Sequence, residues 1–220
     1  MCSIRTYGRG VTTPQGVLDF GGERADEVAG SLDALAIRTE LSRGAWVDLA
    51  PGWLSDPDAL FISLRDGAAW QAERRQMYDA MVEVPRLTAF YGETDTWPDP
   101  LLHELRARLS DHYRPVLGEP LVTAGLCLYR DGRDSVAWHG DRIGRSRYAD
   151  TIVAIVSLGS TRTLALRPMG GGKSLKFATG HGDLIVMGGS CQRTWEHSIP
   201  KTDAAVGPRI SIQFRVAGVR

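Results

Sequence analysis

Hydrophobic and polar residues alternate near the C-terminal end of the chain, between residues 209 and 216. A period of two residues places every second side chain on the same face of a β-strand. One face of this predicted strand carries only the apolar residues Ile210, Ile212, Phe214 and Val216. The opposite face carries only the polar residues Arg209, Ser211, Gln213 and Arg215. The alternation therefore predicts a strand with one face in the core and one polar face.

Several more short apolar runs follow residue 119 and are separated by glycines. We expect strands at residues 121–129, 151–158, 163–167, 174–177 and 183–187. Many short strands with glycine-rich turns are typical of a β-sandwich or jelly roll. The second half of the chain is therefore expected to be mainly β.

Two helices are predicted upstream, each opened by an aspartate followed by a proline. Asp56 precedes Pro57, and Asp99 precedes Pro100 and four leucines at helical spacing, which are Leu101, Leu102, Leu105 and Leu109. Aspartate favours the N-cap and proline the first helical turn. We expect both helices to cover one side of a sheet.

No internal repeat or long linker divides the chain. We expect one structural domain, in which residues 1–84 form an N-terminal extension with strands and helices that support a core of residues 85–220. With 220 residues, of which 43% are hydrophobic and 24% charged, the chain can bury a sizeable core without crosslinks.

The three cysteines show no Cys-x-x-Cys spacing, which argues against a disulfide framework and a tetrahedral zinc site. The segment Met1–Arg5 opens no apolar stretch, so we expect neither a secretory signal nor a membrane partner, and a cytoplasmic protein.

Positive charge is concentrated in the second half, although the net charge is zero. Residues 1–110 contain 11 Lys+Arg and 17 Asp+Glu, a balance of −6, and residues 111–220 contain 15 and 9, a balance of +6. A basic half is compatible with a polyanionic partner, because phosphates bind Lys and Arg. An ordinary mixed surface is the alternative interpretation.

Three residues form a candidate metal site. His139 and Asp141 make a His-x-Asp pair, and His197 lies downstream. Two imidazoles and one carboxylate on one side of Fe(II) leave the opposite positions open for an oxidant and a co-substrate. The alternative is a loop pair with an unrelated core histidine. On the polar face of the strand at 209–216, Arg209 and Arg215 could hold a dicarboxylic acid, because a guanidinium matches a carboxylate bidentately.

Five segments, in order, resemble the AlkB family of Fe(II)- and 2-oxoglutarate-dependent dioxygenases, which remove alkyl groups from nucleic-acid bases. The segments are Leu128–Gly132, Trp138–Asp141, Gly182–Met187, Gln192–His197 and Arg209–Arg215, and the resemblance runs from about Pro85 to Val216. It implies a double-stranded β-helix, that is, a jelly-roll core with flanking α-helices. It also implies that His139, Asp141 and His197 are catalytic ligands of Fe(II).

The resemblance assigns further roles around 2-oxoglutarate. Arg209 matches the family residue that holds the distal carboxylate, and Arg215 matches a second arginine near the proximal carboxylate. Tyr129 matches a tyrosine that hydrogen-bonds the co-substrate, with a plain sheet aromatic as the alternative. Ser211 shares their polar face and is expected to bind the co-substrate as well.

A target base must leave its stack and stack again on an aromatic, a contribution of roughly 1–3 kcal/mol per base. The candidates are Tyr91, Phe90, Trp97 and Trp138, with the ring of His139 as a second wall, although core packing is the alternative for each aromatic. Arg86 and Arg167 are the candidate cations near the substrate. We expect alkylated nucleic acid as the partner, DNA rather than RNA, with single strands acceptable, and a monomeric protein.

Three departures from the family pattern affect the substrate. The family has Asn-x-Tyr where this chain has Cys127-Leu128-Tyr129, and an acidic residue where this chain has Ile143. A longer loop with paired tyrosines is replaced by the short segment 93–97. Fewer buried polar contacts should weaken discrimination between bases, so a bulky lesion is expected to be tolerated.

Two rival functions stay open at this point. The first is an Fe(II)/2-oxoglutarate hydroxylase that acts on a protein or a small metabolite. The second is a non-catalytic β-sandwich that binds metal or nucleic acid. Slow conversion of 2-oxoglutarate to succinate would exclude the second, and the salt dependence of nucleic-acid binding would separate the first from a dealkylase.

Overall fold

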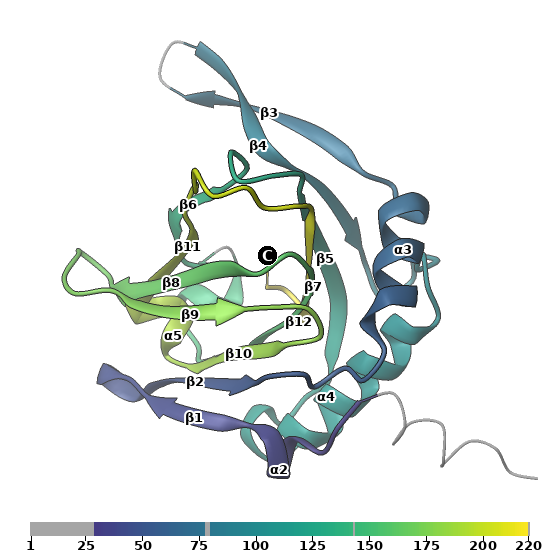
Figure 1. Cartoon of the computed structure of the whole chain (residues 1–220). Coiled ribbons are helices and arrows are strands. Elements are labelled where there is room, and N and C mark those ends of the chain that lie inside the picture. Colours follow the sequence, from purple (N-terminus) through teal and green to yellow (C-terminus); the bar gives the residue numbers. More distant parts are fainter. Residues whose placement is uncertain (1–28, 78–79, 143, 220) are drawn as a thin grey trace, which may run out of the picture.

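Two antiparallel sheets face each other across a shared core in the computed structural model, which describes residues 29–77, 80–142 and 144–219 (Figure 1). The large sheet has the order β1-β2-β10-β7-β12-β5-β4-β3, and the small sheet has the order β6-β11-β8-β9. Apolar side chains from both sheets meet in one buried cluster, which includes Ile155, Leu164, Ile185 and Trp195. This arrangement is a jelly-roll core, as predicted from the sequence.

The strands of the large sheet are β1 (Ile37–Glu40), β2 (Ala45–Ala50), β3 (Gln71–Met77), β4 (Ala80–Tyr91), β5 (Leu121–Tyr129), β7 (Val153–Gly159), β10 (Leu184–Gly189) and β12 (Arg209–Val216). Those of the small sheet are β6 (Val136–His139), β8 (Arg162–Pro168), β9 (Leu175–Thr179) and β11 (Trp195–Ile199). The α-helices are α2 (Leu32–Leu35), α3 (Pro57–Gly67), α4 (Leu101–Leu117) and α5 (Cys191–Thr194). Short 3-10 turns occur at η1 (Ser42–Gly44) and η2 (Arg145–Arg147).

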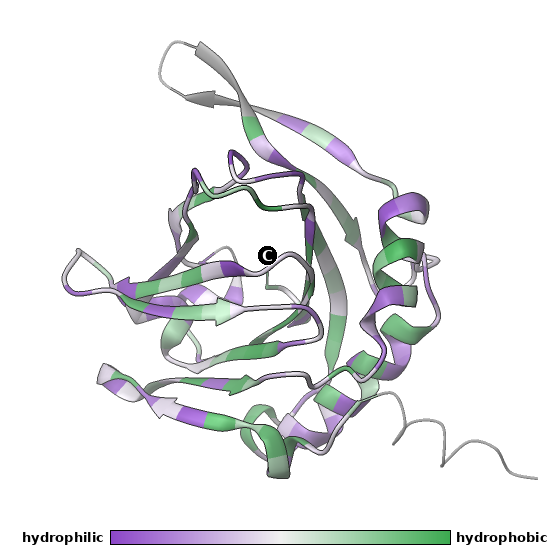
Figure 2. Cartoon of the chain, viewed as in Figure 1, coloured by the Kyte–Doolittle hydropathy of each residue, from purple (hydrophilic) through white to green (hydrophobic). Residues whose placement is uncertain are grey.

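Helices α3 and α4 cover the outer face of the large sheet, as the leucine spacing predicts (Figure 2). Leu60 and Leu64 of α3 join the core, and so do the fully buried leucines Leu102, Leu105 and Leu109 of α4. Burial of each leucine contributes roughly 1.5–3 kcal/mol. Helix α4 begins at Leu101, one residue later than predicted, and the Asp99 side chain accepts a hydrogen bond from the Leu101 amide at 2.9 Å.

Strand β12 lies in the middle of the large sheet and shows the predicted alternation. Its four apolar side chains are fully buried beneath the helices. Its polar side chains therefore point to the other side, toward the small sheet. The polar face of β12 lines the space between the two sheets.

Strands from the N-terminal part belong to the same large sheet as the later strands. Strand β2 pairs with β10, and β4 pairs with β5 and runs across the predicted boundary at residues 84 and 85. The division of the domain at that point stays a prediction. No strand range was predicted from the sequence for β1, β2, β3, β4, β6 or β11. Across the described ranges, no helix is both long and apolar enough to cross a membrane.

Candidate active site

His139 and His197 lie opposite each other on neighbouring strands of the small sheet. His139 ends β6 and His197 is in the middle of β11, and the two residues are direct partners in the β6–β11 register. Side chains of directly paired residues share one face of a sheet. Their ring centroids are 4.2 Å apart, with the planes tilted by 50°. Local strand pairing therefore brings together two imidazoles that are far apart in the sequence.

Asp141 reaches the histidines because the chain turns sharply after β6. A Cβ atom on Gly140 would lie 2.8 Å from the carbonyl oxygen of Gln192, so only glycine fits this close approach. The Asp141 amide donates to Oε1 of Gln192 at 3.0 Å, and the hydroxyl of Ser146 donates to the Asp141 carbonyl. These contacts fix the turn that carries the carboxylate.

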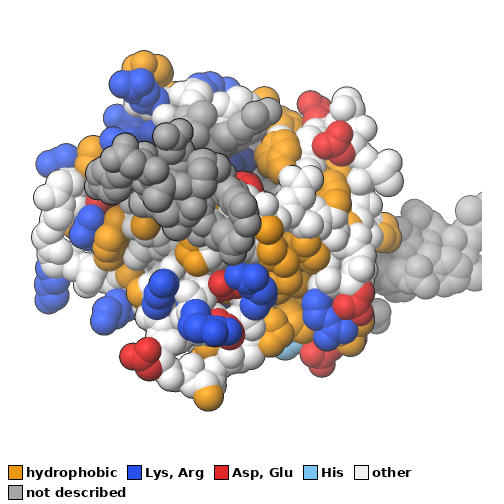
Figure 3. Space-filling model, turned by 90° about the horizontal axis from the view of Figure 1, so that it is seen from above, with side chains coloured by type: hydrophobic (Ala, Val, Ile, Leu, Met, Phe, Trp, Pro, Cys, Tyr) orange, Lys and Arg blue, Asp and Glu red, His pale blue; other side chains and the backbone are white. Residues whose placement is uncertain are grey.

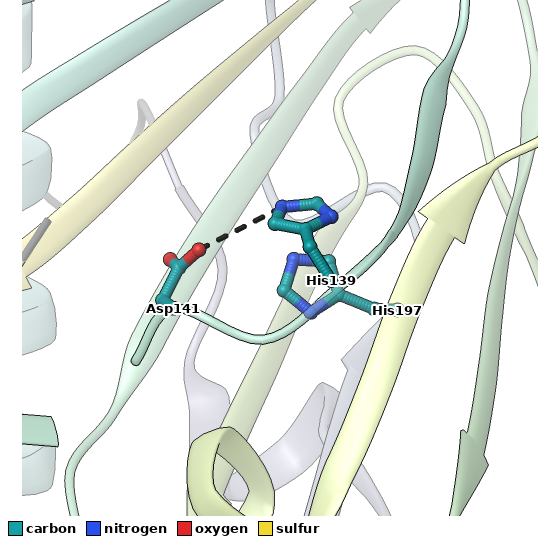
Figure 4. Close-up of side chains that lie close together, drawn as sticks. All are labelled: His139, Asp141 and His197. Atoms are coloured by element: carbon teal, nitrogen blue, oxygen red, sulfur yellow. Dashed lines mark ion pairs between the residues drawn. The ribbon is translucent and has the colours of Figure 1, made fainter. Parts of the chain in front are cut away.

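The three side chains point toward one another (Figure 4). Their potential ligand atoms all lie within 4.8 Å of one another, and His139 Nε2 is 3.7 Å from Asp141 Oδ1. His139 Nδ1 lies 2.9 Å from the Ala137 carbonyl, so the hydrogen belongs on Nδ1 and Nε2 keeps its lone pair. Two nitrogens and one carboxylate oxygen on one side are the donor set that suits Fe(II) with open positions.

The electrostatics favour the protonation states that a metal requires. Burial opposes the charge on Asp141, but the Arg215 guanidinium and the two imidazoles outweigh it and lower the pKa of Asp141 to about 2. Burial, together with the neighbouring His139, lowers the pKa of His197 to about 3. At neutral pH, Asp141 is therefore a carboxylate and His197 is a neutral imidazole.

A cavity of about 330 Å³ opens beside these three residues, between the two sheets. Its polar wall comes from β12 and β5, and its apolar wall includes Val153, Ile155 and Leu164. All four predicted co-substrate residues line the cavity, namely Tyr129, Arg209, Ser211 and Arg215.

Arg209 is a buried cation at one end of the cavity. Its Nε donates to the Ser157 hydroxyl at 2.9 Å and its Nη2 to the Thr179 hydroxyl at 3.3 Å. Within the described part of the chain, no carboxylate pairs with it and its Nη1 has no hydrogen-bond partner. Burial lowers the pKa of Arg209. A buried guanidinium with a free donor fits the distal carboxylate of a dicarboxylic co-substrate.

Tyr129 and Arg86 lie on the same side of the large sheet. The ring of Tyr129 is 5.4 Å from the Arg209 guanidinium carbon, and burial raises the pKa of its hydroxyl. Arg86 lines the cavity, and its Nη1 donates to the Ser135 carbonyl at 3.3 Å. The structure thus places Arg86 beside the predicted co-substrate residues.

Trp138 and Arg167 lie together on the outer face of the small sheet. The Arg167 guanidinium stacks over the Trp138 ring at 4.2 Å and pairs with Glu196 at 3.0 Å. Glu196 pairs with Arg167 in the register, next to His197, so strand alternation turns it away from the cavity. Neither Trp138 nor Arg167 lines the cavity.

Tyr91 and Trp97 belong to the core beneath the helices. The Tyr91 hydroxyl accepts a hydrogen bond from the Ala69 amide at 3.0 Å, and Trp97 Nε1 donates to the Gly92 carbonyl at 2.9 Å. The Trp97 ring also stacks on His103, with centroids 4.4 Å apart. Both aromatics are less than 10% exposed, so core packing describes their contacts.

Sequence reasoning missed Gln192 and Gly140 as supports of Asp141. Gln192 is buried and 51 residues away from Asp141 along the chain, so no local motif indicates the contact. Of the three departures, Cys127 lines the cavity, whereas Ile143 lies outside the described residues.

Residues 67–215 match the profile of the 2OG-Fe(II) oxygenase superfamily. The chain is 32% identical over 190 residues to alpha-ketoglutarate-dependent dioxygenase alkB homolog 3 from Bos taurus, covering 77% of this chain and 65% of that protein. It is 29% identical over 159 residues to the human DNA oxidative demethylase ALKBH2, covering 64% of this chain and 60% of that protein. The solved structure titled "The structure of OsALKBH1" has a TM-score of 0.58 at 16% identity, and the match covers 82% of this chain and 100% of that one.

The fold, the three candidate ligands and the unpaired Arg209 define an oxygenase of the non-haem iron class. The chain belongs to the 2OG-Fe(II) oxygenase superfamily and, within it, to the AlkB family. This family uses Fe(II) and 2-oxoglutarate, and the residues of the cavity fit both. The chain spans 65% of the length of the bovine alkB homolog 3.

Proposed function

We propose that the protein removes alkyl groups from the bases of DNA or RNA, with Fe(II), 2-oxoglutarate and O2. The observation that carries this proposal is a metal triad next to a buried, unpaired Arg209 in one cavity. A module that only binds nucleic acid needs neither feature. The names of the relatives, alkB homolog 3 and DNA oxidative demethylase ALKBH2, support nucleic acid as the substrate.

His139, Asp141 and His197 would hold the metal, and Arg209 would hold the distal carboxylate of 2-oxoglutarate. When bound, the iron supplies the oxidising chemistry, in which 2-oxoglutarate and O2 yield succinate and CO2 and one oxygen atom enters a C–H bond of the N-alkyl group. Arg215 keeps Asp141 ionised and oriented. Val153, Ile155 and Leu164 keep water from that part of the cavity.

An N-hydroxymethyl group has its hydroxyl and the ring nitrogen on the same carbon. The C–N bond of such a group breaks in water, so the base regains its N–H and the methyl carbon leaves as formaldehyde. Larger alkyl groups would leave as the corresponding aldehydes. The protein therefore needs no residue for the second step.

Of the four aromatic candidates, Phe90 best fits a wall for the extruded base. Phe90 is 47% exposed, and it pairs with Gly125 in the β4–β5 register. Gly125 pairs in turn with Gln213, which lines the cavity, so Phe90 and Gln213 share one face of the sheet. Tyr91 and Trp97 are core residues, and Trp138 lies on the outer face of the small sheet.

Exposed cations support a polyanionic substrate. In Figure 3, Lys and Arg side chains gather on the left, the side on which the β8–β9 loop lies in Figure 1. Lys173 and Lys176 in this region are exposed, and so are Arg142 and Arg147, close after Asp141. Such cations bind phosphates without base specificity, and this affinity falls steeply as salt increases.

The test is mass spectrometry of single-stranded DNA and RNA oligonucleotides that carry 1-methyladenine, 3-methylcytosine or an etheno adduct. With Fe(II), 2-oxoglutarate and ascorbate, we expect loss of the adduct, and no loss with His139→Ala. His112→Ala, which changes a histidine outside the cavity, is the matched control and should keep the activity. Intact adducts together with steady succinate formation would redirect the search to a protein or metabolite substrate. Binding of the oligonucleotide that does not weaken between low and high salt would also count against phosphate contacts.

A further inference from the structure

The cavity wall formed by β5 and β12 consists of three cross-strand pairs. Tyr129 pairs with Arg209, Cys127 with Ser211, and Gly125 with Gln213. The first pair contains the cation that fits the distal carboxylate. Next along β12 lies Arg215, which contacts the metal-ligating carboxylate. A dicarboxylic co-substrate held at Arg209 and at the metal must therefore pass over the Cys127–Ser211 pair and Gln213.

Three polar groups in this middle region form a chain of hydrogen bonds. The Cys127 thiol is a weak, distant donor to Oε1 of Gln213, at 3.9 Å. Gln213 Nε2 donates to the Ser211 hydroxyl oxygen at 2.5 Å and to the Ser211 carbonyl at 3.2 Å. The Gln213 amide is thus fixed with its oxygen toward Cys127 and its nitrogen toward Ser211.

The Gln213 side-chain amide can take this position because Gly125 has no side chain. A Cβ atom at Gly125 would lie 3.1 Å from Oε1 of Gln213 and 2.9 Å from Nη1 of Arg215. Both contacts are closer than a side chain normally allows. Any larger residue at position 125 would push the amide away from Cys127 and would also displace Arg215.

The direction of these hydrogen bonds decides whether the Ser211 hydroxyl is a donor or an acceptor toward a ligand. Because its oxygen already accepts a hydrogen from Gln213, the Ser211 hydroxyl hydrogen must point elsewhere. Ser211 is 3% exposed and lines the cavity, so its hydroxyl hydrogen is free to donate to a ligand in the cavity. Cys127 also lines this wall, but its thiol is only a weak donor.

We propose that Gln213 is a positioning residue that orients the Ser211 hydroxyl as a donor to the 2-oxo acid end of 2-oxoglutarate. Gln213 and Ser211 together supply a donor on a wall where Cys127 offers only a weak one. The inference rests on the proposed use of 2-oxoglutarate, and it is independent of which alkylated base is the substrate.

The test is the affinity for 2-oxoglutarate of the Mn(II)-loaded protein, measured by calorimetry without oligonucleotide. Gln213→Leu keeps the shape and removes both polar atoms, so we expect binding about 3- to 10-fold weaker. Gln213→Glu accepts the Ser211 hydrogen and adds a negative charge, so we expect a larger loss. The exposed Gln71 of β3 provides the control, because Gln71→Leu should bind as the wild type does.

A double-mutant cycle tests whether Gln213 acts through Ser211 or only by packing against the ligand. If Gln213 acts through Ser211, then Ser211→Ala weakens binding by itself, and adding Gln213→Leu to it has little further effect. Losses of affinity that add up in the double variant would contradict a positioning role of Gln213. A Gln213→Leu protein that binds 2-oxoglutarate within two-fold of the wild type would contradict it as well. If the wild type binds no 2-oxoglutarate at all, the proposed function itself is wrong, which distinguishes the two failures.

Discussion

Arg215 holds one oxygen of Asp141 and leaves the other for a metal. Its Nε and Nη2 donate to Oδ2 of Asp141 at 2.8 and 2.7 Å, while Oδ1 faces His139 Nε2 at 3.7 Å. The guanidinium comes from the large sheet and the carboxylate from the turn after β6. The ion pair therefore fixes the triad relative to the co-substrate wall.

Replacing Arg215 with methionine should weaken metal binding by about 10- to 100-fold, the usual effect of removing a partner of a metal ligand. The physical reason is that Asp141 loses its charge partner and its orientation. Calorimetric titration with Mn(II) measures the affinity. Arg147→Met, which removes an exposed arginine that follows Asp141 in the sequence and lies outside the cavity, is the matched control. An unchanged affinity in Arg215→Met would contradict the role of the ion pair.

Arg209→Met should have opposite effects on ligand binding and on stability. The variant removes a buried cation whose Nη1 has no partner, so the melting temperature of the ligand-free protein should stay the same or rise. The stabilisation that 2-oxoglutarate gives the wild type should disappear. Thermal melts with and without 2-oxoglutarate measure both effects.

Arg162→Met is the informative comparison. Arg162 is also buried, but its guanidinium donates to the backbone carbonyls of Asp131, Asp134 and Pro200. Its loss should lower the melting temperature, because three backbone carbonyls, one of them in a fully buried hydrogen bond, lose their donor. A similar drop in Arg209→Met would mean that Arg209 is a structural residue.

Gln192→Leu should reduce metal affinity without touching a ligand. The Asp141 amide would lose its acceptor, at a cost of roughly 1–3 kcal/mol for a buried donor left unpaired. Gln192→Glu keeps an acceptor oxygen at the same reach and should retain more of the affinity. Equal Mn(II) affinities for the leucine variant and the wild type would show that the turn holds without this bond.

The two described cysteines should differ in reactivity. Burial, with a smaller contribution from Asp141, raises the pKa of Cys191 to about 12, so its thiolate stays scarce as the pH rises from 7 to 9. Cys127 lines the cavity and is only partly buried. Peptide mapping after iodoacetamide treatment should show labelling of Cys127, protection of Cys127 by 2-oxoglutarate, and an unlabelled Cys191. Comparable labelling of both in the folded protein would disprove the assignment.

The sequence predicted the elements whose patterns are local. The alternation of β12 and the leucine spacing of α4 follow from periods of two and of three to four residues, and both agree with the structure. Strand β6 escaped prediction because it has four residues and its register with β11 shifts between Val136 and His139. A short, irregular strand has no period to detect.

The sequence also brought together the three candidate ligands, through their resemblance to a family motif. It did not reveal their supports, because contacts such as Gln192 with Asp141 depend on how distant strands and turns meet. The aromatic candidates show the same limit. Tyr91 and Phe90 are adjacent in the chain, yet one is buried in the core and the other is 47% exposed on the opposite face.

The most direct test of the central claim is to measure succinate and the repaired base in one reaction. With an oligonucleotide that carries a methylated base, wild-type protein, Fe(II), 2-oxoglutarate and O2, the account predicts one additional succinate for each methyl group lost, with formaldehyde in the same amount. His197→Ala should form neither product. Loss of the methyl group without succinate, or no loss with any methylated base in DNA or RNA while succinate accumulates, would contradict the proposed dealkylation.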